Sequence, residues 1–255
     1  MFSLLITATD TGVGKTVVTA ALIAEARRRG MDAVPMKPSQ TGCVWAGGRW
    51  IAPDLEFCYE MSGYRPPSVE MGLACPFPFV PACSPHLAAM MAGRRVSLAS
   101  IAYRHRRLCE AHDLVAVEGI GGVRVPLNTQ DTMLDLMAAL RLPVLLVVRT
   151  GLGTLNHTLL SLDVLRATGI PLLGLIAVRS ITGAMSVLEQ DNLEFMEQRG
   201  NIPILGCLER HDSLAQGRMT PEEFRSEVAP AMGPALDALE NFLEPGVDGM
   251  LPELG

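Results

Sequence analysis

The chain has 255 residues, of which 49% are hydrophobic and 19% charged, with a formal net charge of −6 and a pI of about 5.4. This composition is typical of a globular protein and excludes a largely disordered chain. The negative net charge argues against a protein that binds nucleic acid along its phosphate backbone, because such binding needs surplus Lys and Arg. It does not argue against binding a single nucleotide, which backbone N–H groups can hold.

Apolar segments typical of buried strands alternate with helical segments along the chain. Strands are expected at 2–8, 33–37, 114–118, 143–148, 171–179 and 202–208. Helices are expected at 15–29, 132–140, 155–168, 185–199 and within 221–243. Strands separated by helices of about 10–15 residues predict right-handed βαβ crossovers. The predicted fold class is therefore α/β and doubly wound, with a mostly parallel sheet flanked by helices.

No repeat, low-complexity tract or composition shift divides the sequence, so we expect a single domain over residues 1–245 and a flexible tail over 246–255. The stretch 43–85 is rich in Gly and Pro and is expected to carry loops and short helices. Ser84-Pro85-His86 precedes a helical stretch, and His86 is either a catalytic residue or a packed or capping histidine.

The apolar segments are too short for a secretory leader or a membrane span. Residues 1–6 lack a basic flank, and the run 142–148 is far below the ~20 residues that a span needs. The six cysteines form no C-x-x-C pair, which favours reduced thiols. We expect a cytoplasmic protein with no membrane partner.

A phosphate-binding loop is indicated between the first strand and the first helix. Residues 8–16 read ATDTGVGKT, which has the strand–loop–helix context of a P-loop, although the strict pattern would place glycine at Thr9. Free N–H groups at the start of the helix would cradle phosphates. Lys15 would reach the β and γ phosphates, and the Thr16 hydroxyl would ligate Mg²⁺. Nucleotide contacts are expected from Gly12, Val13, Gly14, Lys15, Thr16 and Val17.

A second lysine is expected in the same crevice. Lys37 ends the second strand, and ligands of a parallel sheet bind outside the carboxyl ends of the strands. The alternative is a surface lysine whose stem covers apolar neighbours. Two cations beside one triphosphate predict stabilisation of charge on a transferred phosphoryl group.

Two carboxylates are candidates for binding magnesium. Glu118 ends the third strand, and Gly119 and Gly121 follow it in a Gly-rich turn that is expected to contact the nucleotide. A buried acid at that position needs a partner. Asp54, expected in a loop, is either the second carboxylate or a solvated acid.

A second Gly-rich turn follows the strand that ends at Val148. Residues 151–157 read GLGTLNH and open a helix. Free N–H groups at this point would bind a substrate carboxylate. The alternative is an ordinary β–α loop in which Thr154 or Asn156 caps the helix.

Taken together, these motifs resemble those of the dethiobiotin synthetase family, from the first strand to about Leu205. The matching positions are Thr9-Asp10-Thr11, Val13 to Thr16, Lys37-Pro38, Thr41-Gly42, Asp54, Ser84-Pro85-His86, Val117 to Gly119, Gly121-Gly122, Pro126-Leu127, Leu152-Gly153 and Asn156-His157. The resemblance implies a ligase of biotin biosynthesis that uses ATP to close the ureido ring of dethiobiotin from 7,8-diaminopelargonic acid and CO₂, through a carbamate and a carbamic-phosphoric anhydride, and releases ADP and phosphate.

The resemblance also implies roles for individual residues. Those implied in catalysis are Lys37, Lys15 and Thr11. Those implied in substrate binding are Thr11, Lys37 and Thr41, with Leu152, Gly153, Thr154 and Asn156 from the other subunit of a homodimer. Those implied in binding the cofactor Mg²⁺ are Thr16, Asp54 and Glu118.

The base-binding end departs from the family pattern. The family usually has an Asn-Asp pair after the strand that here ends in Val178 and Arg179, and Glu209-Arg210-His211 stands where a Pro-containing segment contacts the base. Val178 and Arg179 are still expected beside the nucleotide, but a valine side chain cannot donate and accept hydrogen bonds as Asn does. We therefore expect weakened discrimination among nucleotides.

Other classes remain open on the sequence alone. One is a ParA/MinD-like NTPase switch, which usually carries an extra Lys near the start of the loop, where this chain has Thr9-Asp10-Thr11. A cobyrinate-type amidoligase would need an appended glutaminase domain, for which this chain is too short. A non-catalytic nucleotide-binding module also remains, because a fold alone does not assign function.

Overall fold

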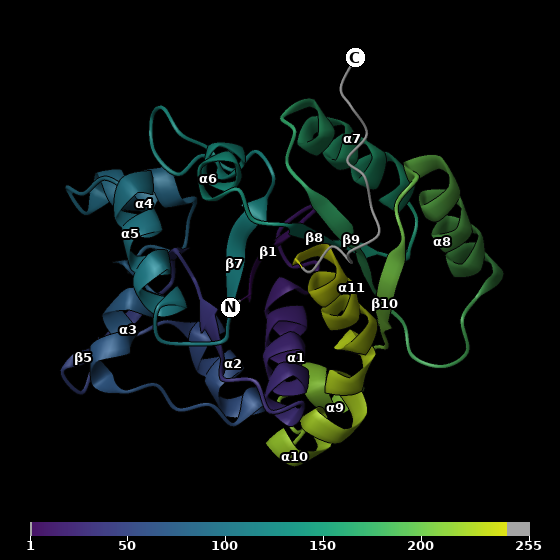
Figure 1. Ribbon diagram of the computed structural model, residues 1–255, viewed down its shortest axis with the longest axis horizontal. Coiled ribbons are helices and arrows are strands. Elements are labelled where there is room, and N and C mark those ends of the chain that lie inside the picture. Colours follow the sequence, from purple (N-terminus) through teal and green to yellow (C-terminus); the bar gives the residue numbers. More distant parts are fainter. Residues whose placement is uncertain (1, 244–255) are drawn as a thin grey trace.

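A computed structural model describes residues 2–243, so the expected tail and the boundary at residue 245 lie outside the described part. Helices cover both sides of a central sheet (Figure 1). Within residues 2–243, no helix combines the length and apolar character needed to cross a membrane.

The central sheet has six strands in the order β10-β9-β8-β1-β7-β2, and every neighbouring pair is parallel. The strands are β1 (Phe2–Ala8), β2 (Ala33–Met36), β7 (Leu114–Gly122), β8 (Val144–Arg149), β9 (Leu172–Val178) and β10 (Ile204–Leu208). The doubly wound α/β fold predicted from the sequence is thus confirmed. In the registers, Leu5 lies opposite both Val117 of β7 and Val144 of β8.

The helices are α1 (Lys15–Arg28), α2 (Pro53–Ser62), α3 (Ser68–Ala74), α4 (Pro85–Met91), α5 (Leu98–Cys109), α6 (Met133–Leu140), α7 (Thr154–Ala167), α8 (Val187–Gly200), α9 (Asp212–Ala215), α10 (Pro221–Glu223) and α11 (Gly233–Leu243). A π-helical turn, η1 (Phe224–Val228), and a 3₁₀ turn, η2 (Ala229–Met232), join α10 to α11. The C-terminal helix expected within 221–243 is therefore present, but in several pieces.

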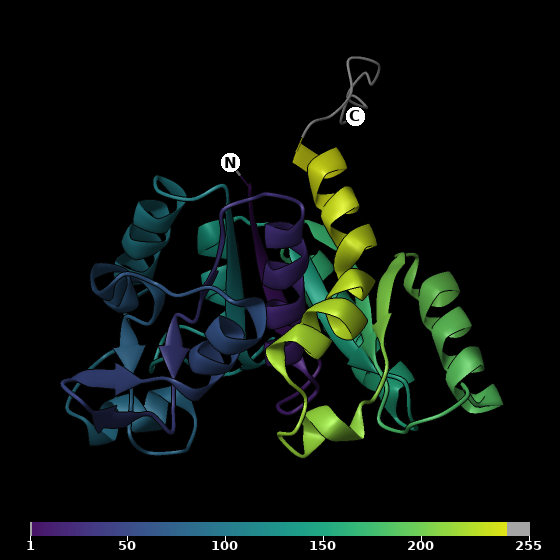
Figure 2. The ribbon, with the colours of Figure 1, turned by 90° about the horizontal axis from the view of Figure 1, so that it is seen from below.

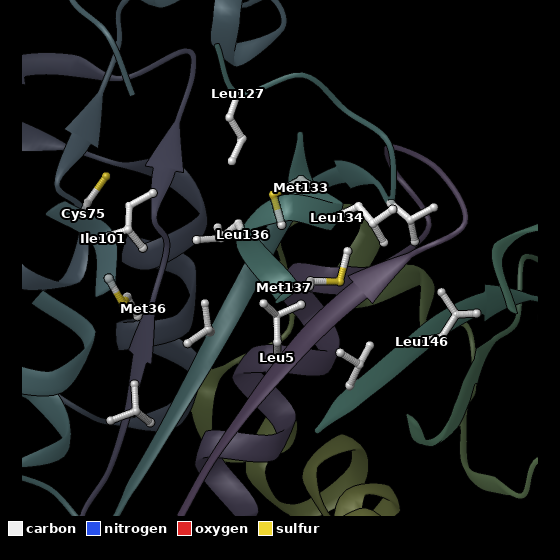
Figure 3. Packing of buried hydrophobic residues seen from close by; sticks show 14 of the residues in the cluster. Leu5, Met36, Cys75, Ile101, Leu127, Met133, Leu134, Leu136, Met137 and Leu146 are labelled. Atoms are coloured by element: carbon white, nitrogen blue, oxygen red, sulfur yellow. The ribbon is translucent and has the colours of Figure 1, made fainter. Parts of the chain in front are cut away.

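Two hydrophobic clusters fill the two faces of the sheet. Along β1, Leu4 and Ile6 belong to the cluster under α1 and α11, whereas Leu5 belongs to the cluster under α5, α6 and α7. All three side chains are fully buried, as a parallel sheet covered on both sides requires. Figure 2 shows α1 and α11 together on one side of the sheet, and Figure 3 shows Met137 of α6 beside Leu5 on the other.

Two small sheets extend the molecule beyond β2. Strands β3 (Ser39–Gln40) and β6 (Phe77–Pro78) pair in parallel, and β4 (Val44–Ala46) and β5 (Arg49–Ile51) form an antiparallel hairpin. The segment 43–85 therefore contains this hairpin as well as the loops and short helices expected there. All six cysteines are free, and four of them are buried.

Candidate nucleotide and substrate site

The predicted phosphate loop connects the end of β1 to the start of α1. Gly12 and Gly14 have φ angles of 69° and 122°, a region that favours glycine. A Cβ placed on Gly14 would lie 3.1 Å from a methyl carbon of Val178, so any larger residue there would also crowd Val178. Lys15 Nζ donates a hydrogen bond to the carbonyl oxygen of Asp10 at 3.0 Å, which folds the loop over the lysine.

A buried ion cluster lies beside this loop. Lys37 is the first residue beyond β2, and its Nζ lies 2.6 Å from Asp54 Oδ2 and 2.6 Å from Glu118 Oε1. Glu118 Oε1 also accepts a hydrogen bond from Thr16 Oγ1 at 2.9 Å. Lys37 Nζ donates a further hydrogen bond to the carbonyl oxygen of Gly119 at 3.2 Å. The cluster therefore joins β2, α2, β7 and the phosphate loop.

The two lysines have opposite pKa shifts. Burial, followed by the charge of Lys37, lowers the pKa of Lys15 from 10.5 to about 8. Burial also opposes the charged form of Lys37, but the adjacent carboxylates of Glu118 and Asp54 outweigh it and hold the pKa of Lys37 above its ordinary value. Lys37 thus stays an ammonium ion although its side chain is only 5% exposed.

One cavity of about 400 Å³ brings most of the predicted residues together. The predicted residues that line it are Thr11, Gly12, Gly14, Lys15, Thr16, Val17, Lys37, Thr41, Asp54, Glu118 and Gly121. Ser39, Gln40 and Ile120 also line the cavity and were not predicted, although Ser39 and Gln40 directly follow Lys37-Pro38. The volume is in the range of small-molecule sites.

The topology explains this convergence. The phosphate loop follows β1, Lys37 follows β2, and Glu118 lies in β7, which pairs with both of these strands. The order reverses at β1, because β7 lies on one side of it and β8 on the other. Ligands of doubly wound sheets bind at such a switch point, beyond the carboxyl ends of the strands.

A second cavity, of about 240 Å³, lies on the other side of the phosphate loop. Its lining includes Val13, together with Leu152 and Thr154 from the turn before α7. The Leu152 side chain is 93% exposed, whereas Thr154 is buried and its Oγ1 donates to the carbonyl oxygen of Arg149 at 2.7 Å. Within one chain, this turn and Thr41 therefore line different cavities, and Asn156 lies exposed on α7.

Arg149, at the end of β8, is a site residue that was not predicted. Its Nη2 donates to the carbonyl oxygens of Thr11 and Gly12 at 3.4 and 3.3 Å. The sequence signal was available, because Arg149 ends a buried strand as Lys37 follows one. It differs from Lys37 in being exposed.

The two residues expected near the base lie in different surroundings. Val178 packs against Gly14 of the phosphate loop. The Arg179 guanidinium is instead engaged with Glu189, whose Oε1 lies 3.0 Å from Arg179 Nε, and with the carbonyl oxygens of Gly183 and Ala184. This gives Arg179 a structural role, and its contact with a nucleotide stays a prediction.

Asp54 differs in position from the expectation, whereas His86 fits the alternative of a packed histidine. Asp54 is in the first turn of α2 and not in a loop, which fixes its direction towards Lys37. His86 is on α4 and does not line the Lys15 cavity; its Nδ1 is buried without a hydrogen-bond partner among the described residues.

The sheet order, the loop between β1 and α1, and the lysine and carboxylate beside it define a P-loop nucleotide-binding protein of the α/β class. A family model described as an AAA domain matches residues 3–218. Similar solved structures include the cell division ATPase MinD of Pyrococcus furiosus, with a TM-score of 0.62, 16% identity, and coverage of 95% of this chain and all of that one. At that identity the likeness shows the fold alone.

The sequence comparisons define the family more narrowly. An ATP-dependent dethiobiotin synthetase of Anaeromyxobacter dehalogenans is 46% identical over 180 residues, which are 71% of this chain and 78% of the relative. Another of that name, from Nitrosospira multiformis, is 42% identical over 211 residues, or 82% and 89% of the two chains. The chain belongs to the dethiobiotin synthetase family.

Proposed function

We propose that this protein closes the ureido ring of dethiobiotin from 7,8-diaminopelargonic acid, CO₂ and ATP. The observation that carries the proposal is the placement of Lys15 and Lys37 in one cavity with Thr11 and Thr41. Phosphate binding alone would need the loop and Lys15. The additional cation and hydroxyls suit an anionic acceptor that must approach the γ-phosphate. Membership of the dethiobiotin synthetase family supports ATP as the phosphoryl donor and dethiobiotin as the product.

The chemistry proceeds in two bond-forming steps. One amine of the substrate takes up CO₂ as a carbamate, and a carbamate oxygen attacks the γ-phosphorus, so that ADP leaves and a carbamic-phosphoric anhydride forms. The second amine then attacks the carbonyl carbon, phosphate leaves, and the ring closes. Lys15 and Lys37 lower the repulsion between the two anions in the first step, and Thr11 and Thr41 orient the carbamate.

Thr16, Asp54 and Glu118 fit a magnesium ion by their chemistry, because all three present hard oxygen atoms beside the phosphate loop. Among residues 2–243, no group of three or more His, Cys, Asp or Glu side chains is placed to hold a metal. A nucleotide-bound Mg²⁺ needs no such cage, since one or two carboxylates with phosphates and waters suffice. When bound, the ion would neutralise charge that develops on the phosphates.

We further propose that the protein acts as a homodimer in the cytoplasm. In such a dimer the turn at Leu152, Gly153, Thr154 and Asn156 would bind the substrate carboxylate in the partner's site. The separation of the two cavities within one chain supports this division.

The direct test is incubation of the protein with 7,8-diaminopelargonic acid, bicarbonate, Mg²⁺ and ATP, with detection of dethiobiotin by mass spectrometry. Lys37→Ala should leave nucleotide affinity largely unchanged and reduce turnover by about 10²–10³-fold, as the loss of one transition-state contact does. Absence of product with every nucleotide would refute the proposal. An equally severe loss of nucleotide affinity in Lys37→Ala would assign Lys37 to the nucleotide site instead.

A further inference from the structure

The contacts of Lys37 indicate a function for this side chain before any phosphoryl transfer. Its Nζ lies 2.6 Å from an oxygen of Asp54 and 2.6 Å from an oxygen of Glu118. The same Glu118 oxygen accepts the Thr16 hydroxyl at 2.9 Å. The ammonium thus directly contacts two of the three residues that would bind magnesium, and the third is bonded to one of them.

We propose that the Lys37 ammonium and the metal ion compete for the carboxylates of Asp54 and Glu118, so that Lys37 leaves both when the metal binds. This inference rests on the metal set of the proposed function. Carboxylate oxygens ligate Mg²⁺ at about 2.0–2.1 Å. An ammonium that kept both of its contacts would lie within a few ångströms of a divalent cation in a buried site, where repulsion is poorly screened.

Because Glu118 is buried, its carboxylate needs a positively charged partner both before and after the metal binds. Glu118 is 1% exposed, and a buried carboxylate is costly without a positively charged partner. Lys37 supplies that charge in the contacts described here, and the metal would supply it after exchange. The Lys37 ammonium therefore stabilises the carboxylates when no metal is bound, and the metal stabilises them after Lys37 has left.

The released side chain has a place to go within the same site. Lys37 lines the cavity that also contains Thr11 and Thr41, the residues assigned to the carbamate. A lysine has a flexible four-carbon stem, so its ammonium can swing without a change in the backbone. Metal binding would then release the Lys37 ammonium to the carbamate, which is the phosphoryl acceptor.

The experiment is a titration of the protein with Mn²⁺, in place of Mg²⁺, in which free Mn²⁺ is measured by electron paramagnetic resonance. Lys37→Met removes the competing ammonium and should bind Mn²⁺ about tenfold or more tightly than the wild type. Lys37→Arg keeps the charge and can bond both carboxylates, so it should bind no more tightly than the wild type.

Lys15→Met is the matched control for charge alone. It removes one positive charge from the same cavity, but the Lys15 ammonium bonds the carbonyl oxygen of Asp10 and neither carboxylate. Its gain in Mn²⁺ affinity should be clearly smaller than that of Lys37→Met. An equal gain, or no gain in Lys37→Met, would overturn the exchange.

Asp54→Asn separates this inference from the metal set on which it rests. Mn²⁺ affinity that does not fall in Asp54→Asn would overturn the metal set, and the exchange with it. If Mn²⁺ affinity falls in Asp54→Asn but does not rise in Lys37→Met, the metal set would stand and only the exchange would be overturned. If circular dichroism shows that Lys37→Met does not fold, the thermal shift produced by Mn²⁺ should be no larger in Lys37→Arg than in the wild type, and a larger shift would contradict the exchange.

Discussion

At the scale of single residues, Val178 connects the phosphate loop to the question of which base the protein accepts. Its methyl groups pack against Gly14, so its side chain lies close to the bound nucleotide expected there. A valine offers no hydrogen bond to a base edge. Polar contacts give the strongest discrimination between ligands, and any such contacts to the base would then have to come from other residues.

We therefore predict weakened base discrimination. With 7,8-diaminopelargonic acid as substrate, kcat/KM for ATP, CTP and GTP should agree within about tenfold, because a site without polar readout distinguishes ligands weakly. Val178→Asn, which restores an amide at this position, should raise the preference for ATP. Steady-state rates with each nucleotide measure this, and strict use of ATP by the wild type would contradict it.

Arg149 acts at the same scale through the backbone of the phosphate loop. By donating to the carbonyl oxygens of Thr11 and Gly12, it helps to hold those peptide groups with their N–H bonds directed away from it. We predict that Arg149→Met raises the KM for ATP by about three- to tenfold, the effect expected when net hydrogen bonds of ordinary strength are lost.

Because Arg149 is exposed, its replacement should change the melting temperature little. Arg149→Lys serves as the control, since it keeps the charge but cannot reproduce the planar fork of the guanidinium. An unchanged KM in Arg149→Met would show that the loop needs no support from β8.

At the scale of elements, the connection from β9 to α8 depends on a buried ion pair. Arg179 and Glu189 have side chains that are 1% and 3% exposed. The hydrogen bonds from Arg179, followed by that from the backbone of Ser186, lower the pKa of Glu189 to about 2. Ser186 and Glu189 also form a capping box at the start of α8.

The shift fixes the sign of a pH dependence. Because the pKa of Glu189 is lower in the folded protein, its contribution to the free energy of unfolding is complete above its ordinary pKa of 4.5 and is lost as the pH falls from about 4.5 towards 2.

Glu189→Gln should therefore be less stable than the wild type by about 3 kcal/mol at pH 7, because Arg179 keeps its buried charge without a partner. Urea unfolding should show the full difference in the free energy of unfolding at pH 7 and 5 and a smaller difference at pH 4 and below. A difference that does not change with pH would exclude the ion pair as its cause.

The six strands of the central sheet were predicted because their residues are mostly apolar and buried. The strand 144–148 is buried on both faces, so its pattern alone identified it. Helix α5 was not predicted, although the signal was present, because Ser97 caps it and it has buried Ile101 and Leu108 on one face and exposed Arg106 and Arg107 on the other. The β4–β5 hairpin was missed because its turn at Gly47 and Gly48 was interpreted only as a loop, although both glycines have positive φ angles.

The site was also predictable only in part, and again the strands carried the prediction. Residues at the ends of strands, such as Lys37 and Glu118, could be placed together because parallel strands end at one edge of the sheet. Contacts that depend on the strand order could not be placed. The position of Arg149 at the end of a strand was visible in the sequence, but its contact with the phosphate loop depends on β8 lying directly beside β1, which no local pattern encodes.

At the scale of the whole molecule, the two cavities on either side of the phosphate loop suggest that a complete site needs two chains. The carbamate end would be built by Lys37 and Thr41 of one chain, and the carboxylate end by the turn that contains Leu152, which is almost fully exposed. The exposed side chain of Leu152 is free to be buried against a second copy, whereas Thr154 at the start of α7 is already buried within its own chain.

This division predicts complementation between two inactive variants. Lys37→Ala disables the carbamate end, and Gly153→Pro disables the turn, because Gly153 has a φ of 89° that proline cannot adopt. In a mixed dimer, one of the two sites receives both defects and the other receives neither. Random exchange in an equal mixture makes half of the dimers mixed, so dethiobiotin synthesis should recover to about one quarter of the wild-type rate. Each variant alone should stay far below that rate under the same conditions. No recovery after verified subunit exchange would place both ends of the site within one chain.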